Sequence, residues 1–256
     1  MRRFSRPALA LILCSLAGSL LAQWGMRGQP AVDAPLRGEP AEWVFARLAY
    51  DGGPGMYSSW TVDYPMAERH FIQAVRRLTR VHSHPTGHVL RPESQDLFDY
   101  PWLYAVEVGS WGFTPEQARN MREYLLRGGF LMVDDFHGEY EWQRFTAGMR
   151  QIFPERPIVD IPEDDPIYQM PYVVGARQQV PGPNYMFTGI TYERGDGVEP
   201  NWRGIRDDHG RIMVAISHNI DYGEGWEQAD TPAYPEEFTR QAYEVGIDYL
   251  IYSLTH

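Results

Sequence analysis

The chain has 256 residues, of which 43% are hydrophobic and 22% are charged, a composition typical of a globular domain. Its formal net charge of -11 argues against a nucleic-acid partner, because a phosphate backbone is bound by a basic surface. The chain contains no lysine, and its one cysteine is Cys14. These absences exclude a Schiff-base lysine and a phosphate loop ending in Gly-Lys, and they leave residues 15–256 without a thiol nucleophile or a cysteine metal site.

The first 22 residues are typical of an export signal. Three arginines precede Ala8–Ala22, an uncharged and mostly apolar stretch that is short for a bilayer span. We therefore expect a Sec-type signal peptide over 1–22 and a periplasmic or secreted protein. Twin-arginine export is one alternative, and an uncleaved anchor, which would place the chain on a membrane, is another. Residues 23–42 are rich in Gly, Pro and Ala, which predicts a flexible linker.

Strands and helices alternate in the next part of the chain. The pattern predicts strands at 43–50, 102–109 and 130–135, and helices at 66–81, 114–127 and 139–153. The clearest local signal is a capping box, in which Thr114 caps a helix, Pro115 opens it and Gln117 stands three residues after the cap. Gly128 and Gly129 are expected to end the same helix. Alternation of this kind predicts a mostly parallel sheet covered by helices on both faces, a three-layer α/β fold.

The second half of the chain has a different pattern. Residues 154–200 are rich in proline and turns, which predicts an irregular insertion. A hairpin is expected next, with its turn at 208–210 and its second strand at 211–216. The apolar spacing of 236–254 predicts a final amphipathic helix. We therefore place a single α/β domain at 43–256.

Five segments in this order resemble a bacterial family catalogued as domain of unknown function 4159. They are "FARLAY", "FDYPWLYAVEVG", "LRGGFLMVDDFHG", "IFPERP" and "GRIMVAISHNIDYGEGWE". The resemblance covers nearly all of 43–256 and implies a flavodoxin-like fold, similar to class I glutamine amidotransferases, in proteins that often belong to the cell envelope. It implies no activity. Amidotransferase chemistry itself is excluded, since the domain lacks a cysteine nucleophile.

The chain departs from the pattern of this family at two positions. Members tend to carry Gly-His-Gly where this chain has Val108–Gly112, and a His-Pro pair where it has Asp165-Pro166. If those histidines are ligands in relatives, the corresponding site is altered here.

Ligands of parallel α/β sheets bind beyond the carboxyl ends of the strands. That rule selects the segments 107–111, 134–137 and 217–227. The ligand-binding candidates outside the middle segment are Trp111, His218, Asn219, Asp221, Glu224 and Trp226.

The acidic tip of the strand at 130–135 is the first candidate site. Asp134, Asp135 and His137 suit a divalent metal or general acid–base catalysis. Such a metal would draw its ligands from Asp134, Asp135, His137, His218 and Asp221. The alternative is that one of the two aspartates caps the following helix.

The loop 217–230 is the second candidate site. Its acids could hold the hydroxyls of a sugar while the ring of Trp226 stacks on it. The alternative is an ordinary turn whose Asn and Asp side chains bond their own backbone.

Three further patterns match known motifs less closely. His82, His84 and His88 form either a metal site or a polar turn. A Ser/His/Asp triad of Ser58, His218 and Asp221 can be assembled, but no nucleophile-elbow motif surrounds the serine. The glycine-rich loop 51–55 lacks the order of a nucleotide motif and is expected to be a mobile loop.

The sequence thus predicts an exported, envelope-associated domain that binds a small polar ligand, such as a carbohydrate or a cell-wall fragment, at the strand ends. A hydrolase assisted by a metal or a carboxylate is the first alternative, and an inactive amidotransferase-like module that docks an envelope protein is the second. The residues leave open whether the protein is an enzyme. The first two hypotheses require that Asp134 and Asp221 meet in a shared polar pocket, whereas the third predicts an exposed apolar patch and no such pocket.

Overall fold

The computed structural model describes residues 31–34, 36, 38 and 40–256, and its compact unit spans Val32–His256. The predicted signal peptide at 1–22 lies outside the described residues. Part of the predicted linker is described, and there Val32 forms a parallel bridge with Val89, so the compact unit begins before residue 43. Within the described part of the chain, no helix combines the length and apolarity that a bilayer span requires.

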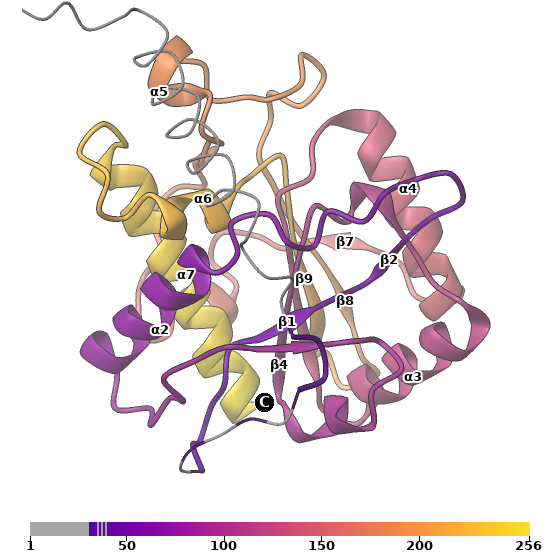
Figure 1. Ribbon diagram of the computed structural model, residues 1–256. Coiled ribbons are helices and arrows are strands. Elements are labelled where there is room, and N and C mark those ends of the chain that lie inside the picture. Colours follow the sequence, from indigo (N-terminus) through magenta and orange to yellow (C-terminus); the bar gives the residue numbers. More distant parts are fainter. Residues whose placement is uncertain (1–30, 35, 37, 39) are drawn as a thin grey trace, which may run out of the picture. The chain divides into compact units, whose positions relative to one another are not determined.

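A seven-stranded sheet forms the centre of this unit (Figure 1). Its order is β3 (His88–Leu90), β1 (Ala46–Leu48), β4 (Trp102–Val106), β6 (Phe130–Asp134), β9 (Ile212–His218), β8 (Asn201–Arg206) and β7 (Val159–Asp160). The first five strands are parallel, β8 is antiparallel to β9, and β7 is antiparallel to β8. The predictions of a mostly parallel α/β sheet and of a hairpin in the second half are therefore confirmed.

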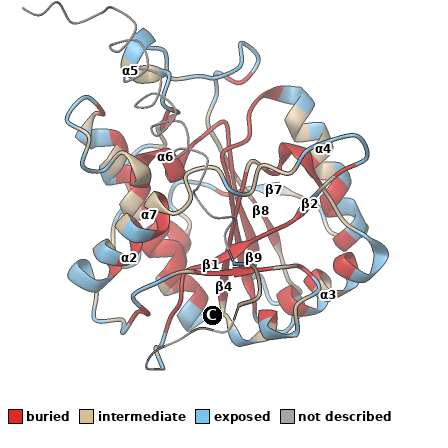
Figure 2. Cartoon of the chain, in the orientation of Figure 1, coloured by how far each residue is buried: buried red, intermediate tan, exposed pale blue. Residues whose placement is uncertain are grey.

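The sheet strands are apolar because both of their faces are covered. Every residue of β4, β6 and β9 is buried, as expected for parallel strands between two helical layers. Figure 2 shows these strands as a buried centre, with exposed surface on the outer sides of the helices, on the loops and on the edge strand β7.

Helices pack on both faces of the sheet. They are α2 (Met66–Leu78), α3 (Pro115–Leu126), α4 (Gly138–Ile152), α6 (Tyr222–Glu227) and α7 (Glu236–Thr255). The short helix α5 (Tyr185–Thr188) lies in the proline-rich insertion and has no buried residue. One core cluster joins the sheet to α2, α6 and α7 through Phe71, Trp226 and Val245. A second core cluster joins the other face to α3 and α4 through Met121 and Phe145. The three layers are visible in Figure 1.

Local sequence signals explain where these helices begin. The predicted capping box is present at α3: the Thr114 hydroxyl accepts from the Gln117 backbone N–H at 3.2 Å, and the Thr114 N–H donates to Gln117 Oε1 at 2.9 Å. The helix is followed by Gly128 at φ +109°, which only glycine adopts readily. β6 can therefore start at Phe130, directly after the turn.

The direction of the chain reverses at the centre of the sheet. From β1 the chain passes to β3 on one side and then to β4 on the other. Connections that leave neighbouring strands in opposite directions open a crevice beyond their carboxyl ends, where α/β proteins bind ligands. A small antiparallel ribbon of β2 (Asp51–Gly52) and β5 (Trp111–Gly112) links the two segments that follow β1 and β4.

The short strands β2, β3, β5 and β7 have no counterpart among the sequence predictions. Residues 82–88 were expected to form a polar turn or a metal site, but His88 opens the edge strand β3. The strand has three residues, too few for a two-residue period to be recognised.

Candidate metal centre

Carboxylates from three distant segments meet beyond the carboxyl ends of the parallel strands. Asp135 follows β6, Asp221 follows β9, and Asp63 precedes α2. One oxygen from each of them lies within 4.8 Å of the others. The expected meeting of the 134–137 and 217–227 segments is confirmed, because the Gly223 N–H also donates to Asp134 Oδ2 at 2.9 Å.

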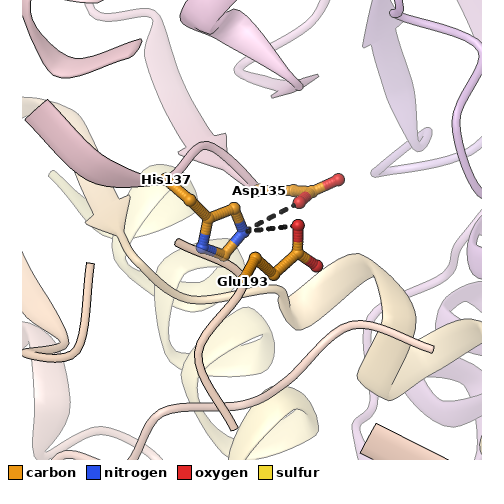
Figure 3. A group of neighbouring side chains, drawn as sticks. All are labelled: Asp135, His137 and Glu193. Atoms are coloured by element: carbon orange, nitrogen blue, oxygen red, sulfur yellow. Dashed lines mark hydrogen bonds and ion pairs between the residues drawn. The ribbon is translucent and has the colours of Figure 1, made fainter. Parts of the chain in front are cut away.

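Two further groups extend this cluster on either side. Asp135, His137 and Glu193 form one, and Asp63, Glu224 and Glu227 form the other, each again with ligand atoms within 4.8 Å. Figure 3 shows His137 Nε2 facing both carboxylates of its group, 3.1 Å from Asp135 Oδ1 and 3.9 Å from Glu193 Oε2. Since Asp63 and Asp135 each belong to two groups, the three groups form one continuous row, which we call the acidic row.

The position of Asp63 in this row is fixed by a buried arginine. Arg47 on β1 donates to the carbonyl oxygens of Trp60 and Val62, each at 2.9 Å, and pairs with Glu68 on α2. Its guanidinium thus holds the backbone that leads into Asp63.

Close packing on the other side of Asp63 requires a glycine. A side chain at position 223 would clash with Asp63 Oδ2 and with the Tyr104 hydroxyl. Gly223 therefore allows α6 to approach the row directly.

Backbone strain is concentrated at this end of the sheet. Of the described non-glycine residues, five have a positive φ, and four of these are Asp63, Glu107, Asp135 and Asn219. Asp and Asn tolerate this conformation better than most residues, whereas Glu does not. Strained residues of this kind persist where surrounding packing forces them and cluster at functional sites. Here they turn the side chains that follow each strand toward the row.

Burial makes the negative charges of the row unfavourable. It raises the pKa of Asp63 to about 7 and that of Glu224 to about 8. The pKa values of Asp135 and Asp221 are held well above the usual range by burial first, and then by Glu107 and by Asp135 respectively. Within the described part of the chain, none of these four acids forms an ion pair with an arginine. The protein itself therefore leaves this charge to be offset by protons or by a cation.

A cavity of about 450 Å³ opens beside the row. Its lining includes His137 and Glu107, and burial, followed by repulsion from Glu141, raises the pKa of Glu107 to about 7. The rim carries two exposed aromatic rings, Tyr57 at 93% and Tyr140 at 63% exposure. A ligand in this cavity would contact both the row and a pair of tyrosines.

Four of the predicted site residues belong to the row: Asp135, His137, Asp221 and Glu224. Asp221 also acts as the cap that the alternative hypothesis predicted, since its Oδ1 accepts from the Glu224 N–H at 2.7 Å at the start of α6. The two hypotheses for the 217–230 segment are thus compatible, because one carboxylate has two oxygens.

Three other candidates support the row without joining it. Asp134 is fully buried, and its Oδ2 accepts from the Tyr104 hydroxyl as well as from Gly223. Asn219 Oδ1 accepts from the Gly138 N–H at 2.8 Å, and His218 Nε2 lies 3.2 Å from the Gly138 carbonyl oxygen. His218 and Asn219 therefore hold the start of α4, and the predicted metal ligands Asp134 and His218 lie outside the three groups.

The two predicted tryptophans are core residues. Trp226 is 0% exposed and its ring lies 4.4 Å from that of Phe71. Trp111 is also buried and stacks on Phe145 at 5.1 Å. The prediction that a sugar stacks on Trp226 is wrong, because the helical turn of α6 directs this side chain into the core.

The weaker sequence patterns do not form sites among the described residues. The ring nitrogens of His218 contact Gly138 and Arg203, and the Ser58 hydroxyl donates to the Tyr50 carbonyl, so the triad is not assembled. His84 Nδ1 bonds Thr86, and His88 Nδ1 bonds the Tyr100 hydroxyl at 2.7 Å. The histidines at 82, 84 and 88 belong to none of the metal groups.

Sequence reasoning missed Asp63 and Glu193. In "YSSWTVDYP" the adjacent serines suggest a nucleophile. Asp63 in the same segment precedes a helix in a loop that follows a strand, and this position is a usable signal for a site residue. Glu193 lies in the proline-rich insertion, where no periodicity places a side chain.

A mostly parallel α/β sheet with an acidic row at the carboxyl ends of its strands, buried at Asp135, Asp221 and Glu224, defines the class of this protein. The chain belongs to the family described as Domain of unknown function (DUF4159), whose sequence model matches residues 44–254. A comparison with curated proteins finds no match.

The two segments at which the sequence was expected to depart from the family pattern lie at opposite ends of the sheet. Ser110 and Gly109 line the cavity, so the first departure bears on the site. Asp165 pairs with Arg206, which is in register with Ile212 at the amino end of β9. The second departure therefore leaves the acidic row unaltered.

Proposed function

We propose that this domain binds a divalent cation at the carboxyl ends of β6 and β9 and uses it to hydrolyse a small polar substrate in the adjoining cavity. One observation carries the proposal: oxygens of Asp63, Asp135 and Asp221 lie within 4.8 Å of one another, buried and without an arginine partner among the described residues. A cation would offset this negative charge and take these oxygens as ligands.

The donor set suits cations that accept both oxygen and nitrogen ligands. Carboxylates suit Mg²⁺, Ca²⁺ and Mn²⁺, and an imidazole extends the range to Zn²⁺. Burial lowers the pKa of His137, which favours the neutral imidazole that a metal requires. Among the described residues, Asp63 Oδ2 and Glu224 Oε1 are buried without a hydrogen-bond partner, and both oxygens could coordinate the cation.

Hydrolysis needs an activated water and a base. A bound cation lowers the pKa of a water molecule and polarises the bond to be cleaved. Glu107 lines the cavity with a pKa of about 7, which suits a general base near neutral pH. It would take a proton from the water as the oxygen bonds to the electrophilic atom of the substrate. The bond to the leaving group then breaks, and Glu107 returns the proton to that group.

Binding without turnover is the second candidate function. Tyr57 and Tyr140 at the cavity rim support a carbohydrate or cell-wall fragment as ligand, since aromatic rings stack on sugars while polar groups bind the hydroxyls. The third hypothesis, an inactive module that docks a protein, predicted a surface without a convergent polar pocket. The acidic row and the adjoining cavity form a convergent polar pocket and therefore argue against this hypothesis.

We also propose the finer fold assignment and the location. The strand order β3-β1-β4-β6-β9 has the 2-1-3-4-5 pattern of flavodoxin-like folds, which supports that fold for the parallel part of the sheet. The arginines and apolar stretch at the start of the sequence support export to the envelope. Cell fractionation together with the mass of the purified chain tests this location, and an unprocessed chain in the cytoplasm would contradict it.

Cation titration of the full chain tests the function. After removal of metals by a chelator, we expect Mn²⁺ to bind by calorimetry and Asp135→Asn to weaken binding about 100-fold or more. Asp208→Asn is the matched control, because Asp208 is 84% exposed at the β8–β9 turn and should bind as the wild type does. Esters, phosphate esters and glycosides with chromogenic leaving groups then test hydrolysis with and without Mn²⁺. A wild-type chain that binds no divalent cation overturns the proposal, and binding without turnover of any substrate favours the second candidate.

A further inference from the structure

We infer that the acidic row holds two divalent cations side by side, one in the group of Asp135, His137 and Glu193 and the other in the group of Asp63, Glu224 and Glu227. This inference rests on the proposed cation-binding function and adds the number, positions and different preferences of the ions.

The charge of the row exceeds what one cation offsets. The three groups together contain six carboxylates, from Asp63, Asp135, Glu193, Asp221, Glu224 and Glu227, and one imidazole. A single divalent cation would offset two of these formal charges, and the two outer groups have no residue in common. Phosphatases, nucleases and aminopeptidases hold two neighbouring cations in sites of this kind.

The geometry places the two groups next to each other. An oxygen of Asp63 and an oxygen of Asp135 lie within 4.8 Å of one another, and each residue belongs to a different outer group. Ions in two-metal centres are commonly about 3.5–4 Å apart, which adjacent carboxylates of this kind allow. Asp221 has an oxygen within 4.8 Å of both residues, so it is placed to bridge the two ions.

An independent observation points to a ligand at the second position. Glu224 is 2% exposed, and its Oε1 has no hydrogen-bond partner in the described structure. Asp63 Oδ2, in the same group, is also buried and has no hydrogen-bond partner among the described residues. Buried polar atoms are nearly always paired, and two unpaired oxygens in one group indicate a missing positive partner.

The two positions differ in chemistry. His137 gives the first an imidazole nitrogen, which suits Zn²⁺ and Mn²⁺. The second position offers carboxylate oxygen from all three residues, which suits Mg²⁺, Ca²⁺ and Mn²⁺. Mn²⁺ suits both and is therefore the probe of choice, whereas Zn²⁺ should compete at the first position only.

The test counts Mn²⁺ ions bound to the full chain after chelator treatment. We expect two per wild-type chain, with the electron paramagnetic resonance signal of a coupled pair. His137→Ala and Glu224→Gln should each bind one and lose the coupling, and Asp208→Asn should still bind two. Zn²⁺ should displace one Mn²⁺ from the wild type and none from His137→Ala.

Glu193→Gln and Glu227→Gln repeat the test at each position in case a first variant fails to fold, which circular dichroism would show. A wild-type chain that binds a single Mn²⁺ overturns the two-ion inference and leaves the proposed function standing. A chain that binds none overturns both. Two uncoupled ions that survive His137→Ala and Glu224→Gln also overturn the inference, because they must lie elsewhere.

Discussion

Acidic residues at the two ends of the central sheet differ in their ion-pair partners. At the amino end, acids are paired with arginines: Asp165 with Arg206 at 2.5 Å, and Asp207 with Arg211 at 3.1 Å. Arg211 also donates to the Leu125 carbonyl oxygen at 2.7 Å, and so closes the end of α3. Both of these acids are therefore paired within the fold.

At the carboxyl end, the acids face one another. Asp63, Asp135 and Asp221 converge without an arginine ion pair in the described part of the chain, and Arg47, the buried arginine nearby, pairs with Glu68. Selection for stability alone would not gather unpaired carboxylates in the interior, since each raises the free energy of the folded state. Acids that converge in this way, with pKa values raised by burial and without an arginine ion pair in the described part of the chain, are a candidate binding site.

Removing the one buried arginine at the carboxyl end should give the largest effect on folding. Arg47→Met leaves Glu68 buried without a partner and releases the backbone before Asp63. We expect the free energy of unfolding to fall by about 3–5 kcal/mol in a denaturant titration. The double variant Arg47→Met/Glu68→Met should recover part of this loss, because it removes the unpaired charge. A loss below about 1 kcal/mol in the single variant would contradict the assigned role of Arg47.

The free energy of unfolding should depend on pH, because buried carboxylates of the site have no arginine ion pair among the described residues. Burial raises the folded-state pKa of Asp134 and of Glu224 to about 8. The folded chain then binds more protons than the unfolded chain between about pH 4 and pH 8, so the free energy of unfolding falls as pH rises through this window. In chelator, we expect a decrease of about 2 kcal/mol or more between pH 5 and pH 8.

Two controls sharpen this expectation. Asp134→Asn keeps an acceptor for Tyr104 and Gly223 but carries no charge, so it should flatten the pH profile and stabilise the chain at pH 8. Saturating Mn²⁺ should flatten the profile of the wild type, because a bound cation offsets the same charges. Stability that rises from pH 5 to pH 8 in chelator would show that the acids are better compensated than the structure indicates.

The smallest effect should come from an exposed pair at the amino end. Glu155 lies 2.5 Å from Arg122, whose hydrogen bond lowers the pKa of this carboxyl, and about half of the Glu155 side chain is exposed. Its stabilising contribution is present at neutral pH and is lost as pH falls through the lowered pKa. Glu155→Gln should cost less than about 1 kcal/mol at pH 7 by denaturant titration. A larger loss would show that ion pairs at the amino end affect the free energy of unfolding as strongly as the acidic row at the carboxyl end does.

Local signals made much of the fold predictable. The box at Thr114 and Gln117 and the apolar run after Gly129 each act within a few residues, and both appear in the structure at the expected places. The strand-end rule also found Asp135 and Asp221, because carboxyl ends of parallel strands share one edge of the sheet.

The remaining site residues depend on long-range packing that a single sequence does not encode locally. Asp63 reaches the row because Arg47 holds the loop before it, and Glu193 reaches it from an insertion without periodicity. Trp226 resembled a binding residue because it stands among polar neighbours, yet a short helix turns it inward. Distinguishing the two faces of a six-residue helix requires knowing what packs against it.

That same short helix has a consequence for ion selection. Glu224 and Glu227 flank Trp226, whose indole is wedged into the aromatic core against Phe71. Their backbone is thereby clamped and cannot readily spread to enclose a larger ion. Because Ca²⁺ takes more oxygen ligands at longer distances than Mg²⁺, a position with its backbone fixed in this way should favour the smaller cation.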